Sequence, residues 1–305
     1  MITGPRAPSG PLRLVLAVSV LAALASSCTA GSPAQVPGVV RVVAGENVWG
    51  NVIAQIGGVH ARVVSLIADP NADPHLYQAG VQDALEVAEA SLVVENGAGY
   101  DDFVSRLVSA THHSGRVVVS VQRVLGAGGG ATNPHFWYQG ARVPEVAAAV
   151  ERSLAGLDPA DASYFAANLD RFDRSLAPLE AVVTRIRDRF AGAPVAYTER
   201  VPAYLVAEAG LADVTPHGFA ASVEDGNDPS PADTAAMTHL IDSRAIRALL
   251  YNEQATSPAA SRVRGLAAAH HIAVVGVTES LPLSFATYQA WQAAQARAIL
   301  AALEG

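Results

Sequence analysis

The sequence predicts an α/β protein with two lobes, each a four-stranded parallel sheet with flanking helices, joined by one long rigid helix. Two observations lead to this fold class. Short runs rich in β-branched residues alternate with longer helical patterns in both halves of the chain, as in parallel sheets covered by helices. Between the halves, apolar residues recur in steps of three and four over one long stretch. The chain has 305 residues, 50% hydrophobic and 16% charged, which is enough for two packed domains.

The N-terminal lobe is expected over residues 38–157. Its predicted strands are residues 39–43, 62–67, 92–95 and 116–121. Its predicted helices are residues 47–56, 81–90, 101–110 and 143–154. Each strand precedes one helix, which favours a parallel sheet because parallel neighbours need a crossover connection.

The linking segment, residues 158–191, holds the long helix, which is predicted over residues 161–190. Asp158-Pro159 marks its start, and a Gly-Ala-Pro sequence at 192–194 marks its end. Pro178 lies inside it and predicts a kink or a weakened turn, because proline lacks the backbone N–H and its ring clashes with the preceding turn.

The C-terminal lobe is expected over residues 192–305 and repeats the alternating pattern. Its predicted strands are residues 195–198, 213–216, 247–251 and 272–277. Its predicted helices are residues 202–208, 231–241, 259–269 and 288–303. The two lobes show no sequence repeat, so their likeness lies in the order of elements.

The N-terminal residues 1–27 are interpreted as a signal peptide. Arg6 and Arg13 come first, and an apolar run of about a dozen residues, 14–25, follows. Such a run is too short to span a membrane comfortably and suits the apolar region of an export signal. The chain is therefore expected to leave the cytoplasm.

The only cysteine, Cys28, directly follows the small residues Ala25-Ser26-Ser27. This arrangement resembles a bacterial lipobox, in which the cysteine is lipidated and becomes the first residue of the mature chain. Residues 28–37 are rich in Gly, Ser, Pro and Ala and are interpreted as a flexible tether. The alternative is an ordinary secretory signal that is cleaved nearby.

Composition excludes several classes of function. The net charge of −8 argues against nucleic acid as a partner, because phosphate binding needs clustered positive charge. All 20 basic residues are arginine, which excludes Walker-A phosphate loops and Schiff-base enzymes, since both require lysine. A single cysteine excludes an intrachain disulfide and a four-cysteine metal site.

Side chains that bind metal ions follow four of the predicted strands. His75 follows the second strand and His135 the fourth, while Glu199 and Glu279 follow the first and last strands of the C-terminal lobe. Both histidines come directly after a proline, with an aromatic residue two positions later. Because a two-lobed α/β protein binds its ligand beyond the carboxyl ends of its strands, we expect these four side chains to line one cleft.

Two imidazoles and two carboxylates favour a divalent transition-metal ion. Imidazole suits zinc, manganese and iron, and carboxylate adds hard oxygen donors. Two ionised carboxylates neutralise the charge of a 2+ ion, but they repel one another when no metal is bound. We therefore expect the affinity to weaken at acid pH, as the ligands take up protons.

The segments around these residues resemble the solute-binding proteins of zinc and manganese ABC importers, and the resemblance covers residues 38–305. It is carried by Asp73-Pro74-His75-Leu76-Tyr77, Leu92-Val93-Val94-Glu95-Asn96-Gly97, Asn133-Pro134-His135-Phe136-Trp137, Tyr197-Thr198-Glu199 and Val277-Thr278-Glu279. It implies metal ligands at His75, His135 and Glu199, with a fourth late in the chain. Aspartate is commoner there than Glu279, so a neighbour such as Asp228 is the alternative fourth ligand.

The resemblance also implies what the protein does and where. It implies a monomer that captures manganese or zinc and hands the ion to the membrane permease of an ABC importer. Lipidated Cys28 would anchor it to the outer face of the cytoplasmic membrane. Glu199, in place of a third histidine, favours manganese slightly over zinc, because it adds an oxygen donor. Two lobes joined by a stiff helix imply small lobe motion.

Two other functions remain as alternatives. A zinc-dependent hydrolase could use His75, His135 and Glu199, with water in the fourth position. However, the chain shows no separate general base and neither His-Glu-x-x-His nor Gly-x-Ser-x-Gly, so we do not expect an enzyme. A siderophore, haem or cobalamin binder could share the architecture, but it needs a wide cleft lined by aromatic residues or arginine.

Overall fold

The computed structural model describes residues 1–4, 38–70, 77–128, 132–255 and 257–305. Residues 37–305 form one compact unit. Cys28, most of the predicted signal peptide and the tether lie outside the described residues, as does His75. Within the described ranges, no helix has both the length and the apolar character needed to cross a membrane.

The first lobe is built on a four-stranded parallel sheet with the strand order β2-β1-β3-β4. Its strands are β1 (Val40–Glu46), β2 (Ala61–Ile67), β3 (Leu92–Glu95) and β4 (Val117–Ser120). Alternate side chains of β1 enter different cores: Val42 and Ala44 lie in one cluster and Val43 in another. The sheet is thus buried on both faces, which explains its nearly continuous apolar strands.

Helices cover both faces of this sheet. They are α1 (Asn47–Gly57), α2 (Val81–Glu89), α3 (Asp102–Ala110), the short α4 (Val121–Val124) and α5 (Val143–Leu157). Buried residues of α1 and α5 share a core with one face, and those of α2 and α3 share a core with the other. Short 3-10 helices, Gly58–His60, Phe136–Tyr138, Gly140–Arg142 and Pro159–Asp161, complete the connections.

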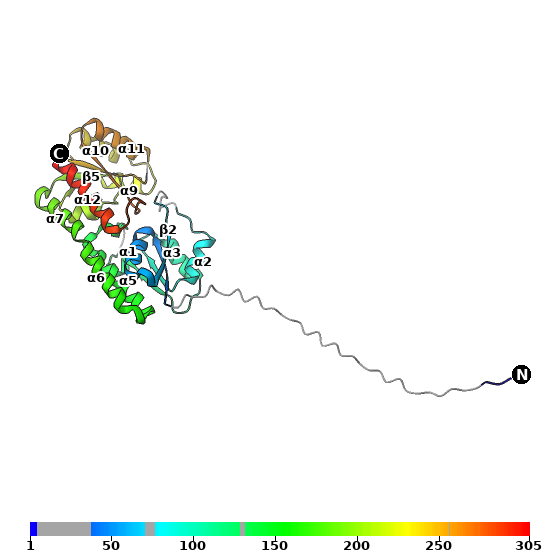
Figure 1. Cartoon of the computed structure of the whole chain (residues 1–305). Coiled ribbons are helices and arrows are strands. Elements are labelled where there is room, and N and C mark those ends of the chain that lie inside the picture. The colour runs from blue at the N-terminus through cyan, green and yellow to red at the C-terminus, as the bar shows by residue number, and fades with distance from the viewer. Residues whose placement is uncertain (5–37, 71–76, 129–131, 256) are drawn as a thin grey trace. The chain divides into compact units, whose positions relative to one another are not determined.

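The predicted long helix is present but interrupted. It forms α6 (Ala162–Ser175) and α7 (Ala177–Phe190), with a break at Leu176. Pro178 is the second residue of α7 and cannot donate the backbone hydrogen bond that would continue α6. Leu176 keeps helical backbone angles, φ −77° and ψ −18°, so the chain continues from α6 into α7 without a loop. Figure 1 shows the two helices one after the other, α6 near α1 and α7 near α12.

The second lobe also has a four-stranded parallel sheet, with the order β6-β5-β7-β8. Its strands are β5 (Pro194–Tyr197), β6 (Ala212–Asp213), β7 (Ala248–Asn252) and β8 (Ala273–Val277). Its helices are α8 (Ala203–Glu208), α9 (His217–Glu224), α10 (Pro231–Asp242), α11 (Pro258–Ala269) and α12 (Tyr288–Glu304). The predicted fold class is confirmed. The sequence missed α9 and overextended β6, which stops before Pro216.

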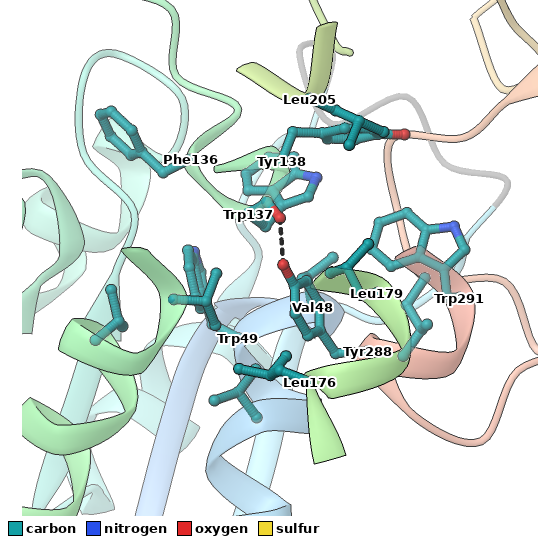
Figure 2. Close-up of a cluster of buried hydrophobic side chains, with 14 of the residues drawn as sticks. Val48, Trp49, Phe136, Trp137, Tyr138, Leu176, Leu179, Leu205, Tyr288 and Trp291 are labelled. Atoms are coloured by element: carbon teal, nitrogen blue, oxygen red, sulfur yellow. Dashed lines mark hydrogen bonds between the residues drawn. The ribbon is translucent and has the colours of Figure 1, made fainter. Parts of the chain in front are cut away.

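One hydrophobic core joins the two lobes. Figure 2 shows Trp49 of α1, Trp137, Leu179 of α7, and Tyr288 and Trp291 of α12 within a single cluster. The Tyr288 hydroxyl donates a hydrogen bond of 2.6 Å to the carbonyl oxygen of Trp137. A large opening of the lobes would have to expose this core to water, which supports the prediction of small lobe motion.

Polar side chains also join the two lobes. Asn47, the first residue of α1, donates from its amide to the carbonyl oxygen of Leu281 and accepts from the Leu281 backbone N–H, both at 3.0 Å. Gln55 and Gln289 exchange amide hydrogen bonds of 2.7 and 3.1 Å. The segment that follows β8 is therefore fixed against α1 of the first lobe.

Candidate metal centre

Three of the four predicted ligands lie in described parts of the chain, and all three are buried. His135 precedes the 3-10 helix Phe136–Tyr138, Glu199 lies two residues after β5, and Glu279 lies two residues after β8. Their exposed fractions are 0%, 2% and 0%. Buried histidine and glutamate side chains need polar or ionic partners, so their contacts decide what this site can bind.

His135 and Glu279 meet directly. The Nε2 atom of His135 lies 3.2 Å from Oε1 of Glu279, and the hydroxyl of Tyr100 donates to the same oxygen at 2.9 Å. His135 and Tyr100 belong to the first lobe and Glu279 to the second. The contact therefore places a nitrogen and an oxygen donor atom side by side where the lobes meet.

Asn252 connects Glu279 to Glu199. Its side-chain nitrogen donates to Oε2 of Glu199 at 2.7 Å and to Oε2 of Glu279 at 3.3 Å. The two carboxylates are thus held beside one amide group. Asn252 is the last residue of β7, so it lies at the end of a strand, as the predicted ligands do. The strand predicted from the sequence ended one residue earlier, and Asn252 was therefore not among the candidate residues.

The orientation of His135 is set by Asn133. The side-chain oxygen of Asn133 accepts hydrogen bonds from the His135 backbone N–H at 3.1 Å and from Nδ1 at 2.7 Å. Because a backbone N–H can only donate, the Asn133 atom that it contacts is the oxygen, and Nδ1 carries the proton. In the neutral ring, the lone pair of Nε2 then faces Glu279, as in histidines that bind metals through Nε2.

Two further carboxyl groups lie buried near this site. Asp101 accepts hydrogen bonds from the backbone N–H groups of Asn96 and Gly97 at 2.7 and 2.8 Å. Burial raises the pKa of Asp101 to about 6, although these hydrogen bonds act in the opposite direction. Burial also raises the pKa of Glu46 well above its usual value, and the acidic groups of Asp101 and Glu279 raise it further.

The raised pKa of Asp101 predicts a dependence of stability on pH. Between the usual pKa of 3.8 and the folded-state value of about 6, the folded protein binds more protons at this group than the unfolded chain does. Its contribution to stability is therefore full at low pH and falls as the pH rises through about 6. Asp101→Asn should gain about 2 kcal/mol relative to the parent between about pH 4 and pH 7. Urea unfolding of both proteins across this range tests the prediction, and parallel pH profiles would contradict it.

A second group of metal-binding residue types lies elsewhere. One donor atom each of His60, Asp158 and Asp161 falls within 4.8 Å of the others, and no other three such residues in the described ranges meet that limit. His60 precedes β2, so it lies at the amino edge of the first sheet, whereas Glu199 and Glu279 follow the carboxyl ends of strands in the second sheet. Nδ1 of His60 lies 2.6 Å from Asp161, and its ring packs edge-on against Tyr164 at 4.7 Å. Sequence analysis did not predict this group, because His60 lies far from Asp158 and Asp161 in the chain.

Comparisons with known proteins agree with this architecture. The TM-score is 0.73 with the periplasmic zinc-binding protein TroA from Treponema pallidum, at 20% sequence identity over 87% of this chain and 99% of that one. It is 0.72 with the SBP FpvC from Pseudomonas aeruginosa in complex with Mn²⁺, at 20% identity over 87% and 98%. These likenesses show a shared fold.

Sequence comparisons identify the family. The manganese-binding lipoprotein MntA of Halalkalibacterium halodurans is 26% identical over 170 residues, which cover 53% of this chain and 55% of that protein. The chain thus spans little more than half the length of this relative. The family model of the periplasmic zinc-uptake complex component A, ZnuA, matches residues 42–302. It describes components of uptake systems and not enzymes. The chain belongs to this ZnuA family.

Proposed function

We propose that this chain is an extracytoplasmic solute-binding protein that captures Mn²⁺ or Zn²⁺ between its two lobes and delivers the ion to an ABC importer. The observation that carries this proposal is the contact of 3.2 Å between His135 Nε2 and Glu279 Oε1. Two donor atoms that each lie about 2.1 Å from one ion, at right angles, are about 3 Å apart. The pair therefore has a spacing suited to a shared metal ion.

The proposed ligands are His75, His135, Glu199 and Glu279. Glu199 is included because the side-chain nitrogen of Asn252 donates hydrogen bonds to both Glu199 and Glu279, which keeps the two carboxyl groups near one another. Glu279 is preferred to Asp228 because Glu279 is fully buried and faces His135, whereas Asp228 is exposed in the loop between α9 and α10. The ion replaces the proton that His135 Nε2 and Glu279 would otherwise have to share.

The choice of ion follows from the donor types. The set of two imidazoles and two carboxylates suits both manganese and zinc, and Glu199 adds oxygen character that favours manganese slightly. MntA is named a manganese-binding protein and TroA a zinc-binding one, so relatives of either kind are similar to this chain. Mg²⁺ should bind poorly, because it prefers oxygen ligands and loses its water reluctantly.

The proposed location is the outer face of the cytoplasmic membrane. The family is described as periplasmic, and MntA is named a lipoprotein. Lipidation of Cys28 would leave residues 28–37 as a tether between the membrane and the folded unit. The partner would be the membrane permease of the importer, which the family's role in an uptake complex supports.

Metal binding should stabilise the fold measurably. Free Mn²⁺ or Zn²⁺ at about 100 times its Kd should raise the free energy of unfolding by about 2.7 kcal/mol, because the ion binds only the folded chain. Thermal unfolding of protein stripped of metal with a chelator, with and without each ion, measures this gain. Mg²⁺ is the control for non-specific charge effects. Equal stability with and without Mn²⁺ or Zn²⁺, together with no metal in protein purified from defined medium, would refute the proposal.

A further inference from the structure

Glu46 is a buried acidic residue whose place in the fold has no structural explanation. It is the last residue of β1, its exposed fraction is 1%, and neither carboxyl oxygen has a hydrogen-bond partner among the described residues. It stands at the N-cap position of α1 but makes no side-chain capping hydrogen bond. Burying an unsatisfied carboxyl group destabilises a fold, and such groups are rare.

Neighbouring acidic residues show the contrast. Glu95, the last residue of β3, accepts a hydrogen bond of 2.5 Å from the Ser105 hydroxyl and lies 3.5 Å from the Arg123 guanidinium. Asp101 accepts two backbone hydrogen bonds. Each of these carboxyl groups therefore stabilises a local structure, whereas Glu46 does not.

Contacts of the residues on either side place Glu46 near Glu279, one of the proposed ligands. Asp101 packs so closely against Gly45 that a Cβ atom there would clash with its carboxylate. On the other side, Asn47 is hydrogen-bonded to the backbone of Leu281, two residues after Glu279. Glu46 lies between these two contacts in the sequence. The charged and titratable groups that act on it from the surrounding segments are Asp101 and Glu279, and Tyr100 is close enough to be affected by it in turn.

We propose that Glu46 is an additional metal-binding residue of this site, whose buried carboxyl group raises the affinity for a divalent cation. The inference rests on the proposed function, since it needs an ion at His135 and Glu279. In the step involved, the carboxyl group releases its proton to solvent and the cation balances the resulting negative charge.

The proposal predicts that Glu46 affects stability and metal binding in different ways. If Glu46 stabilised the fold, its replacement should lower the free energy of unfolding of the metal-free protein. A buried carboxyl group without hydrogen-bond partners destabilises the metal-free fold. Glu46→Gln keeps the shape of the side chain but cannot ionise, so it should leave the stability of the metal-free protein unchanged or higher. The same change should lower metal affinity.

Calorimetric titration of the full chain with Mn²⁺ and with Zn²⁺, in two buffers of different ionisation enthalpy, tests this inference. We expect Glu46→Gln to weaken binding at least about tenfold, the lower end of what outer metal-site partners contribute. We also expect it to release fewer protons than the parent when the ion binds. Glu95→Gln is the matched control: it should keep the parent's affinity and proton release and lose stability, because it weakens the hydrogen bond from Ser105 and removes the charge that faces Arg123.

The outcomes distinguish this inference from the proposed function. A Glu46→Gln protein that binds both ions like the parent, or that unfolds more easily or fails to fold when metal-free, would overturn the inference alone. A parent protein that binds neither ion would overturn the proposed function and the role of Glu46 with it.

Discussion

Replacing His135 by alanine is expected to lower the affinity for Mn²⁺ or Zn²⁺ by more than about 100-fold, because partners outside the ligand shell already contribute about 10- to 100-fold. The change removes the nitrogen that faces Glu279 at 3.2 Å and leaves that carboxyl group buried without its imidazole neighbour. Competition against a chromogenic chelator measures the affinity, and circular dichroism of the metal-free variant shows whether it is folded.

His60→Ala is the matched control for this experiment. His60 also contacts a carboxylate, Asp161 at 2.6 Å, and it belongs to the one group of three metal-binding residue types that lies within 4.8 Å in the described ranges. If the ion binds at His135 and Glu279, His60→Ala should keep the metal affinity of the parent protein. The opposite result, with binding lost in His60→Ala and retained in His135→Ala, would move the ion to the amino edge of the first sheet.

The sequence predicted the fold well because its pattern is local. Apolar β-branched runs alternate with amphipathic helices, a pattern that predicts parallel sheets. Both sheets of the structure are parallel and have four strands each. Errors occurred where tertiary structure overrides local pattern. Strand β6 ends at Asp213, three residues before the end of the predicted strand, and Pro216 precedes α9, which the pattern did not predict.

The site was predictable only in part. His135, Glu199 and Glu279 were selected because each follows a predicted strand. In the structure His135 contacts Glu279, and Asn252 donates hydrogen bonds to both Glu199 and Glu279. The position of a residue at the end of a strand does not predict the orientation of its side chain. The hydrogen bond that orients His135 and the buried, unbonded carboxyl of Glu46 depend on packing across the two lobes. His75 stays a prediction, since it lies outside the described residues.

Packing around the site leads to the second large effect, in Trp137→Ala. Trp137 is fully buried, and its ring packs edge-on against His135 at 5.4 Å, Tyr100 at 5.1 Å and Trp49 at 6.5 Å between ring centroids. Removing the indole should lower the free energy of unfolding by about 3–5 kcal/mol, because the surrounding rings cannot fill the space. Urea unfolding of the metal-free protein measures this loss, which is a large share of the roughly 5–15 kcal/mol that holds a typical domain folded.

The same substitution should also weaken metal binding in the protein that remains folded. His135 is held by Asn133 on one side and by the Trp137 ring on another, so the cavity gives its imidazole room to turn away from Glu279. Phe165→Ala is the control, because Phe165 is equally buried in the same core but belongs to α6 and packs near His60. It should lose similar stability and keep the parent's affinity. If both variants bind metal like the parent, the core supports the lobes without positioning His135, and Asn133 alone sets the direction of its Nε2 atom.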